Sequence, residues 1–284
     1  MKYLKIFFWF AVTNIAFMLT LSTLFAIIRI FVPSFNTGGI WVESAVIGFA
    51  SSLFSLFTSK FMIKWQMKLR MINRNPSNNK EAMLDVMLEK LSGKLGIKTP
   101  ELAVYDDVIP NAFATGWSKN HALVAFSTGL LNSMTDDEIE GVMAHELSHV
   151  VNGDMITMTM VQGVVNTFVV AISKIVSRAI VNSTDNSTLG TVAYIGLQIL
   201  LGLLLQPIVM VVSRMREYRA DFGSAQLVGK DKMIAALQRL KMIEMKTEDV
   251  PQSIATMGIV DVSVKELFSS HPTLDKRIAS LNKI

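Results

Sequence analysis

The sequence contains four apolar stretches that are candidates for helices crossing a lipid bilayer. They cover residues 6–28, 40–57, 155–173 and 189–212. A spanning helix needs about 20 apolar residues, and the first stretch meets this requirement without a single charge. The spacing of the stretches predicts two helical hairpins, with Pro207 as a kink in the fourth stretch.

The third stretch is less apolar than the others. Several polar residues dilute it, namely Thr157, Thr159, Gln162, Asn166 and Thr167. The sequence therefore leaves open whether residues 155–173 cross the bilayer or form a helix that lies on the membrane or only partly in it.

Between the two predicted hairpins, the pattern changes to that of a water-soluble domain. Apolar positions recur at helical spacing across residues 81–95, and short runs with strand character follow. These runs cover residues 101–105, 111–115 and 122–126, with a turn at residues 118–120. Further on, Thr135 and Glu138 form a capping-box pattern, which predicts that the apolar-periodic helix over residues 139–151 begins in water.

This helix carries the motif H-E-x-x-H at residues 145–149. Residues four apart lie on one face of a helix, so His145 and His149 offer two imidazoles to one point, as a bound zinc ion requires. Glu146 lies beside that point and is placed to take a proton from a water molecule on the metal. The alternative is a solvated helix face that carries these residues by chance, which we disfavour.

Composition narrows the class of protein further. Of the 284 residues, 51% are hydrophobic, and the mean hydropathy of +0.41 is higher than soluble domains usually have. The chain contains no cysteine, which excludes disulfides, zinc ribbons and thiol nucleophiles. Any zinc must therefore be held by histidine and carboxylate, the ligand set of catalytic rather than structural sites.

Basic residues orient the first hairpin. Lys2 and Lys5 precede the first stretch, and a basic run at residues 60–74 follows the second. By the positive-inside rule, both ends of this hairpin face the cytoplasm. Lys174 and Arg178 fall on the expected outer side of the second hairpin and run against the rule.

The basic run at residues 60–74 also raises the question of nucleic-acid binding. The run lacks a folded basic face, and anchoring to lipid headgroups explains it more simply. The net charge of the chain is only +4. We therefore expect the membrane as a partner and no nucleic acid.

A catalytic zinc site needs a third protein ligand besides an open position for water. Glu217 and Asp221 lie four apart after the fourth stretch, so they share a helix face. Glu217 can bind the metal, and Asp221 can accept a hydrogen bond from the second ring nitrogen of a ligand histidine. Arginines are interleaved with them, however, and an exposed charged helix is equally compatible with the spacing.

The motifs together resemble the HtpX family of membrane zinc metalloproteases, which are relatives of the prenyl-protein-processing membrane proteases. The resemblance rests on N-A-F-A-T-G at residues 111–116, the H-E-L-S-H segment with N-G-D at residues 152–154, E-Y-R-A-D at residues 217–221, and His271-Pro272 with Arg277. The order and spacing of these motifs are specific, and the resemblance covers essentially the whole chain.

The resemblance implies an α-helical membrane protein with a cytosolic α+β metalloprotease domain of the zincin type, similar to gluzincins. In such a domain the H-E-x-x-H helix packs near a second ligand helix and a small β-sheet. One zinc ion per chain is implied, with Glu217 as its third ligand. The resemblance also implies a multi-pass protein of the bacterial inner membrane, with its active site facing the cytoplasm, that cleaves damaged or misassembled membrane proteins.

This architecture divides the chain into segments that alternate between membrane and cytosol. Residues 1–58 form the first hairpin, residues 59–154 the first part of the protease domain, residues 155–213 the second hairpin and residues 214–284 the second part of the protease domain. Protein or peptide substrates are the expected partners, while the sequence does not specify the oligomeric state.

Three further residues are candidates for work on the substrate. His271 and Arg277 can donate to the oxyanion of the tetrahedral intermediate, although a turn histidine and a surface or ion-paired arginine fit their positions equally well. Asn111 can line an edge strand that pairs with an extended substrate, or it can be an ordinary strand-edge or turn asparagine.

Three other classes of protein are less consistent with the sequence. An intramembrane zinc protease carries its motif within an apolar span, whereas acidic residues 136–138 and strand-like runs precede it here. A non-enzymatic scaffold or chaperone has no reason to keep Glu146 between two metal-binding histidines. A metal transporter needs polar ligands inside its spans, which offer little beyond Glu43. We therefore expect metal-assisted hydrolysis of peptide bonds.

Overall fold

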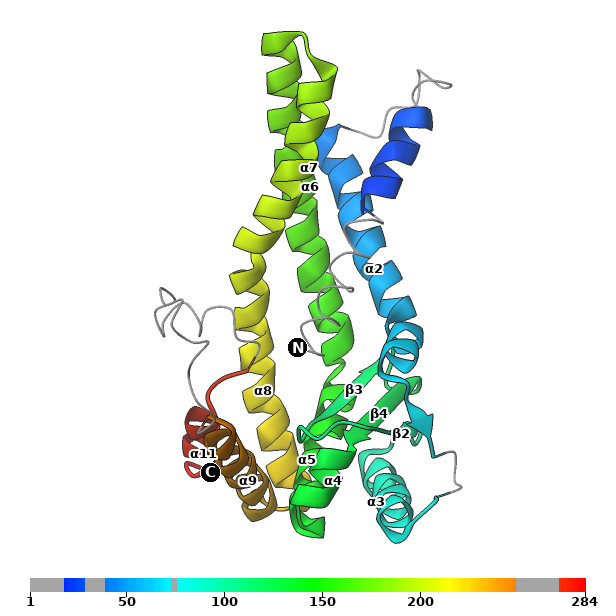
Figure 1. The fold of residues 1–284 in the computed structure, drawn as a ribbon, viewed down its shortest axis with the longest axis vertical. Coiled ribbons are helices and arrows are strands. Elements are labelled where there is room, and N and C mark those ends of the chain that lie inside the picture. Colours follow the sequence, from blue (N-terminus) through cyan, green and yellow to red (C-terminus); the bar gives the residue numbers. More distant parts are fainter. Residues whose placement is uncertain (1–17, 29–38, 73–75, 249–270) are drawn as a thin grey trace. The chain divides into compact units, whose positions relative to one another are not determined.

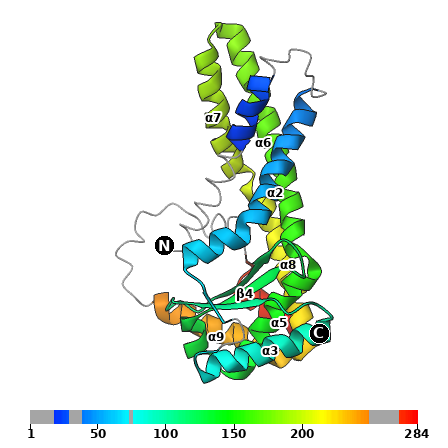
Figure 2. The same cartoon turned by 90° about the vertical axis from the view of Figure 1, so that its right-hand side faces the viewer.

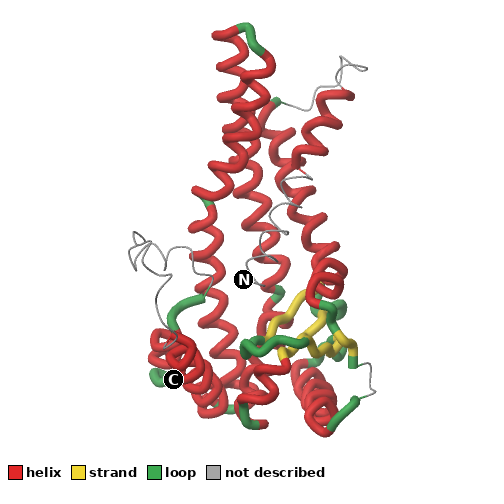
Figure 3. Tube along the Cα trace, in the orientation of Figure 1, coloured by secondary structure: helices red, strands yellow, loops and turns green. Residues whose placement is uncertain are grey.

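The computed structural model describes residues 18–28, 39–72, 76–248 and 271–284. These residues are mostly helical and include one small sheet (Figures 1 and 3). The chain forms two compact units. Unit 1 comprises Met1–Thr58 and Ile156–Val209, and unit 2 comprises Ser59–Met155 and Met210–Ile284. Each unit is thus built from two separate parts of the sequence.

The sheet of unit 2 has the strand order β1-β2-β4-β3. Its strands are β1 (Arg70–Met71), β2 (Glu101–Tyr105), β3 (Ala112–Gly116) and β4 (Ala122–Ser127). β2 runs parallel to β4, whereas β3 and β4 pair antiparallel and leave β3 at the edge. The three predicted strands are confirmed to within one residue at each end, and the short β1 was not predicted.

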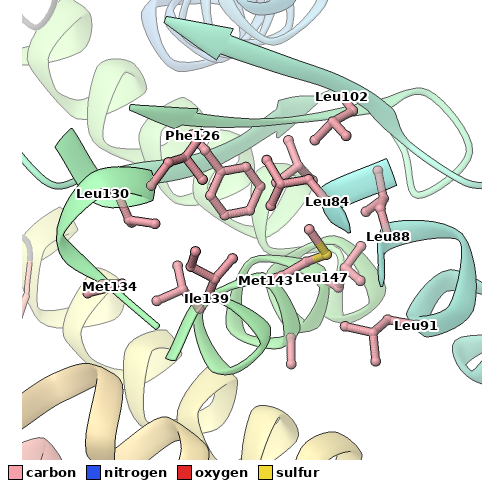
Figure 4. Packing of buried hydrophobic residues seen from close by; sticks show 14 of the residues in the cluster. Leu84, Leu88, Leu91, Leu102, Phe126, Leu130, Met134, Ile139, Met143 and Leu147 are labelled. Atoms are coloured by element: carbon pink, nitrogen blue, oxygen red, sulfur yellow. The ribbon is translucent and has the colours of Figure 1, made fainter. Parts of the chain in front are cut away.

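Helices of unit 2 pack on this sheet and on one another. They include α3 (Asn79–Leu95), α4 (Thr128–Ser133), α5 (Asp136–Asn152), α9 (Lys230–Glu248) and α11 (Leu274–Leu281). α3 and α5 lie on the same face of the sheet (Figure 2). Their apolar side chains meet those of β2 and β4 in a core that includes Leu84, Leu88, Leu102, Phe126, Ile139, Met143 and Leu147 (Figure 4). Burial of these side chains fixes the rotation of α5.

The caps of α5 define where this helix starts and stops. The Thr135 hydroxyl accepts from the backbone N–H of Glu138, and the Glu138 carboxylate accepts from the backbone N–H of Thr135 at 2.8 Å, which confirms the predicted capping box. The helix ends at Gly153, whose φ of 68° lies in the left-handed region that favours glycine. The motif at residues 145–149 therefore lies in the second half of a helix that is fixed at both ends.

Three described helical segments are long and apolar enough, by length and composition, to cross a membrane. They are α2 (Ile40–Met67), α6 (Asp154–Thr184) and the run formed by α7 (Ser187–Leu204) and α8 (Gln206–Val228). The break between α7 and α8 falls at Leu205, which confirms the kink predicted near Pro207. Of the predicted first span, Met18–Ile28 is an apolar helix, and the rest of that span, with Lys2 and Lys5, lies outside the described residues.

The polar residues that dilute the third stretch have partners inside unit 1. The Asn166 side chain donates to the hydroxyls of Ser51 and Ser52 on α2, at 3.3 and 3.1 Å. α2 and α6 also approach closely at Gly48, where an added Cβ would lie 2.6 Å from the backbone nitrogen of Thr167. Small and polar residues at such a contact are typical of helices that pack within a membrane. Low hydropathy in this stretch therefore reflects helix packing in unit 1.

Ion pairs account for basic residues that the sequence assigned to other roles. In unit 1, Lys174 pairs with the buried Glu43, so the lysine that runs against the positive-inside rule is charge-paired. In unit 2, Lys60 and Lys64 both pair with Glu101, at 2.7 and 2.6 Å. The predicted headgroup-anchoring run thus contributes part of its charge to contacts within the protein.

Candidate metal centre

α5 aims both histidines of the motif at one point. The Nε2 atoms of His145 and His149 lie 3.2 Å apart, as the spacing of four residues predicts. His145 is 6% exposed, and Glu146 between them is 9% exposed. All three side chains are therefore largely withdrawn from bulk water.

Glu217 of α8 completes the cluster. Its carboxylate oxygens lie 3.4 Å from His149 Nε2 and 3.5 Å from His145 Nε2. The three residues offer ligand atoms that lie within 4.8 Å of one another. At 2% exposure, Glu217 does not belong to an exposed charged helix, so that alternative for residues 217–221 is wrong.

The donor set fits a divalent metal ion such as zinc. Two imidazoles and one carboxylate are a ligand set of catalytic zinc sites. The Oε2 atom of Glu217 is buried and makes no hydrogen bond of good geometry, although His271 Nδ1, Arg277 Nη1 and His145 Nε2 lie 2.8, 3.3 and 3.5 Å from it. A buried oxygen without a hydrogen bond is costly unless something else satisfies it. A metal ion held by the three residues would coordinate this oxygen directly, so the set fits such an ion.

Carboxylates hold the opposite ring nitrogens of both histidines. The Nδ1 atom of His145 lies 3.0 Å from Asp221, and that of His149 lies 2.6 Å from Asp154. Both rings therefore turn Nε2 toward the centre. Such carboxylate–histidine pairs orient metal ligands and raise their basicity.

These contacts also set the charge of the metal-free site. Burial lowers the pKa of each histidine, but the hydrogen bonds outweigh it. Those to Asp221 and Glu217 raise the pKa of His145, and those to Asp154 and Glu217 raise the pKa of His149 to about 9. A metal ion entering the site must displace protons from these rings.

Arg277 of α11 braces the site from the C-terminal part of the chain. Its Nε and Nη2 atoms donate to the two oxygens of Asp221 at 2.8 and 2.5 Å, while Nη1 lies 3.3 Å from Glu217. Burial lowers the pKa of Arg277, but the Asp221 contact outweighs this and raises it. The side chain is 8% exposed, so of the alternatives left open, the ion-paired arginine agrees with the structure.

His271 lies at the rim of the same site. Its side chain is 61% exposed, yet Nδ1 lies 2.8 Å from Glu217 Oε2. This position lets one imidazole face both solvent and the candidate metal ligands. The structure therefore brings His271 and Arg277 together with His145, His149, Glu217 and Asp221.

Asn111 lies away from these contacts, immediately before the edge strand β3. Its side-chain amide donates to the Tyr105 hydroxyl at 3.1 Å, and its backbone N–H donates to the Ser127 hydroxyl at 2.9 Å. Both contacts hold the start of β3 against β2 and β4. Asn111 thus stabilises the start of the edge strand through hydrogen bonds to other residues of the protein.

Sequence reasoning missed the role of Asp154. This residue follows the left-handed Gly153 and stands five residues after His149, a separation that no helical face predicts. The only signal was its presence in the N-G-D part of the family motif. A turn at Gly153 was needed to bring it back to His149.

Comparison with known proteins agrees with this geometry. Residues 78–284 match Peptidase family M48. A "Protease HtpX homolog" from Neisseria meningitidis serogroup C is 45% identical over 99% of this chain and 100% of its own length. The chain belongs to the HtpX proteases of peptidase family M48. "Protease HtpX" from Haemophilus ducreyi is 45% identical over 97% of this chain and 98% of its own length, and that from Actinobacillus pleuropneumoniae is 48% identical over 88% of each.

The fold is also similar to that of a solved structure. The crystal structure of S. mikatae Ste24p matches with a TM-score of 0.64 and 20% identity, over 92% of this chain and 61% of that chain. Membership of the HtpX family confirms the resemblance seen in the sequence. It also confirms a membrane metalloprotease with the expected α-helical, zincin-like architecture and small sheet.

Proposed function

We propose that the protein is a zinc-dependent endopeptidase that cleaves misfolded or damaged membrane proteins on the cytosolic side of the bacterial inner membrane. The observation that carries this proposal is the convergence of His145, His149 and Glu217, whose ligand atoms lie within 4.8 Å of one another. Zinc is the favoured metal because the set contains no thiolate and mixes imidazole with carboxylate.

His145, His149 and Glu217 hold the metal, and Asp221 fixes the ring of His145. When bound, zinc lowers the pKa of a water molecule and polarises the scissile carbonyl. Glu146 accepts the proton of the attacking water and passes it to the leaving amine. The low exposure of Glu146, 9%, supports this proposal, because little water can compete for the proton.

His271 and Arg277 have different roles in this mechanism. His271 lies at the exposed rim, where its imidazole can donate to the oxyanion that forms on the substrate. Arg277 directs two donors at Asp221, so it acts chiefly by positioning Asp221 and Glu217. Any oxyanion contact from Arg277 is secondary to this role.

The substrate binds as an additional strand along the β3 edge. An extended peptide gains backbone hydrogen bonds there without needing a particular sequence, which suits substrates selected by damage. Asn111 supports this edge by tying its start to Tyr105 and to Ser127.

Glu146→Gln tests the chemistry in full-length protein purified in detergent. The substitution keeps the shape of the side chain but removes the base, so we expect about a 10²- to 10⁴-fold loss of cleavage rate with unchanged zinc content. Glu140→Gln is the matched control, because Glu140 lies on the same helix and pairs with Lys232. Wild-type cleavage by Glu146→Gln would exclude this mechanism.

Topology is tested separately. The segment between His149 and Glu217 is proposed to leave the cytosol and return as a hairpin, so a reporter fused near Asn186 should read as external. A cytoplasmic reading would instead require a hairpin that lies on the membrane surface.

A further inference from the structure

We propose that Asp154 and Arg219 form a second positioning relay for the metal centre, which acts on His149 as Asp221 and Arg277 act on His145. The inference rests on the metal-binding function proposed above. It assigns a role to two residues outside the ligand set, one on α6 and one on α8.

Asp154 is held by contacts on several sides. Its Oδ2 atom accepts from His149 Nδ1 at 2.6 Å, and its Oδ1 atom accepts from Arg219. Arg216 donates to its backbone carbonyl at 3.2 Å. Asp154 is 1% exposed, and a carboxylate buried to this extent needs such partners to remain charged.

The turn at Gly153 makes this arrangement possible. With a φ of 68°, Gly153 ends α5 and turns the chain, so that Asp154, the first residue of α6, lies within hydrogen-bond distance of His149 in the last turn of α5. The first residue of a helix apolar enough to span a membrane is therefore hydrogen-bonded to a metal ligand. The orientation of His149 depends on where α6 begins.

The two relays differ in their exposure to water. The side chain of Arg277 is 8% exposed, whereas that of Arg219 is 52% exposed. Salt screens exposed charges far more than buried ones. The contribution of Arg219 should therefore fall with ionic strength, while that of Asp154 should not.

The relay is tested by the zinc affinity of the full-length protein in detergent. This affinity is measured by competition with a chelator, starting from protein stripped of metal. We expect Asp154→Ala to weaken zinc binding by about 10- to 100-fold, as loss of an orienting carboxylate usually does. Asp154→Asn should lose less zinc affinity than Asp154→Ala, because the amide oxygen of the asparagine can still accept a hydrogen bond from His149 Nδ1. Arg219→Gln should bind zinc more weakly than wild type at low salt, and its zinc affinity should equal that of wild type at high salt.

Two further measurements separate positioning from a merely structural role. The visible spectrum of the cobalt-loaded protein reports ligand geometry, and it should shift in Asp154→Ala. Asp231→Ala is the matched control, since Asp231 is an exposed aspartate in the first turn of α9, and it should change neither affinity nor spectrum.

The possible failures are distinguishable. If wild-type protein binds neither zinc nor cobalt, the proposed function fails and the relay fails with it. If wild type binds zinc, and Asp154→Asn, Asp154→Ala and Arg219→Gln all bind it equally well with an unchanged cobalt spectrum, the relay alone is overturned. A lower melting temperature in those variants would then assign Asp154 to stabilising the turn between α5 and α6.

Discussion

Replacing Arg277 separates two roles that the sequence could not distinguish. An oxyanion donor acts on the reaction, whereas a positioning residue acts on the metal ligands. Arg277 donates twice to Asp221 and lies 3.3 Å from Glu217 through Nη1. We therefore expect Arg277→Ala to lower both the zinc affinity and the free energy of unfolding. These effects do not depend on any role of Arg277 in catalysis.

The structure sets the size of these effects. Arg277 and Asp221 are 8% and 2% exposed, and removing one partner of a buried ion pair costs about 3–5 kcal/mol. Zinc affinity should fall by about 10- to 100-fold, because Asp221 loses the group that holds it against His145. Arg277→Lys should recover only part of the loss, since an ammonium cannot donate in the planar, two-pronged geometry.

The assay combines thermal unfolding, chelator competition and cleavage at saturating zinc, all on detergent-purified protein. Arg239→Ala is the control: Arg239 pairs with Glu138 at 3.4 Å and is 37% exposed, so its loss should cost about 0–1 kcal/mol. Unchanged zinc affinity, combined with a 10²- to 10³-fold lower kcat, would refute the positioning role and assign Arg277 to the oxyanion.

Three other outcomes can be measured with standard methods. Glu217→Ala should abolish both zinc retention and cleavage because only two protein ligands remain, and full zinc occupancy by elemental analysis would show that another carboxylate is the ligand. The Arg70 contact lowers the pKa of Glu81 from 4.5 to about 2, so the stability that Glu81 adds is present above pH 4.5 and is lost as the pH falls toward 2. The melting-temperature difference between wild type and Glu81→Gln should therefore shrink over that range, and a difference that grows toward low pH would contradict this. Lys174→Met should destabilise the protein by about 3–5 kcal/mol, because it leaves the buried Glu43 without its lysine partner, and adding Glu43→Gln should restore most of the melting temperature; no restoration would contradict the pairing.

Local rules predicted the elements that depend on short stretches of sequence. The capping box at Thr135 and the i, i+4 spacing of His145 and His149 act within one helix, so the sequence contains all the information needed. Short runs with strand character likewise located β2, β3 and β4 to within one residue. The two candidate metal ligands on α5 were predictable for this reason.

Contacts between distant elements were not predictable in the same way. The burial of Glu217 depends on how α8 packs beside α5 (Figure 1), which the interleaved arginines concealed. The polar residues of α6 made it look like a weak membrane span. The partners of Asn166 on α2, Ser51 and Ser52, lie more than a hundred positions away in the sequence. The Asp154–His149 contact required a left-handed residue at Gly153 between two helices, and no periodic pattern contains such a break.

Gly141 shows how helix packing next to the candidate metal centre restricts the choice of side chain at one position. An added Cβ at Gly141 would lie 2.8 Å from the backbone oxygen of Lys232 on α9, and the Ser224 hydroxyl of α8 donates to the Gly141 carbonyl at 2.8 Å. Helix α5 therefore meets both neighbours one turn before His145.

Within an isolated helix, Gly→Ala is favourable by about 1 kcal/mol. At position 141 the added Cβ would lie within 3 Å of the α9 backbone, so α5 and α9 would have to move apart. Helix propensity favours alanine at this position, whereas the packing of α5 against α9 favours glycine. Stability-driven redesign of the protein should leave Gly141 unchanged.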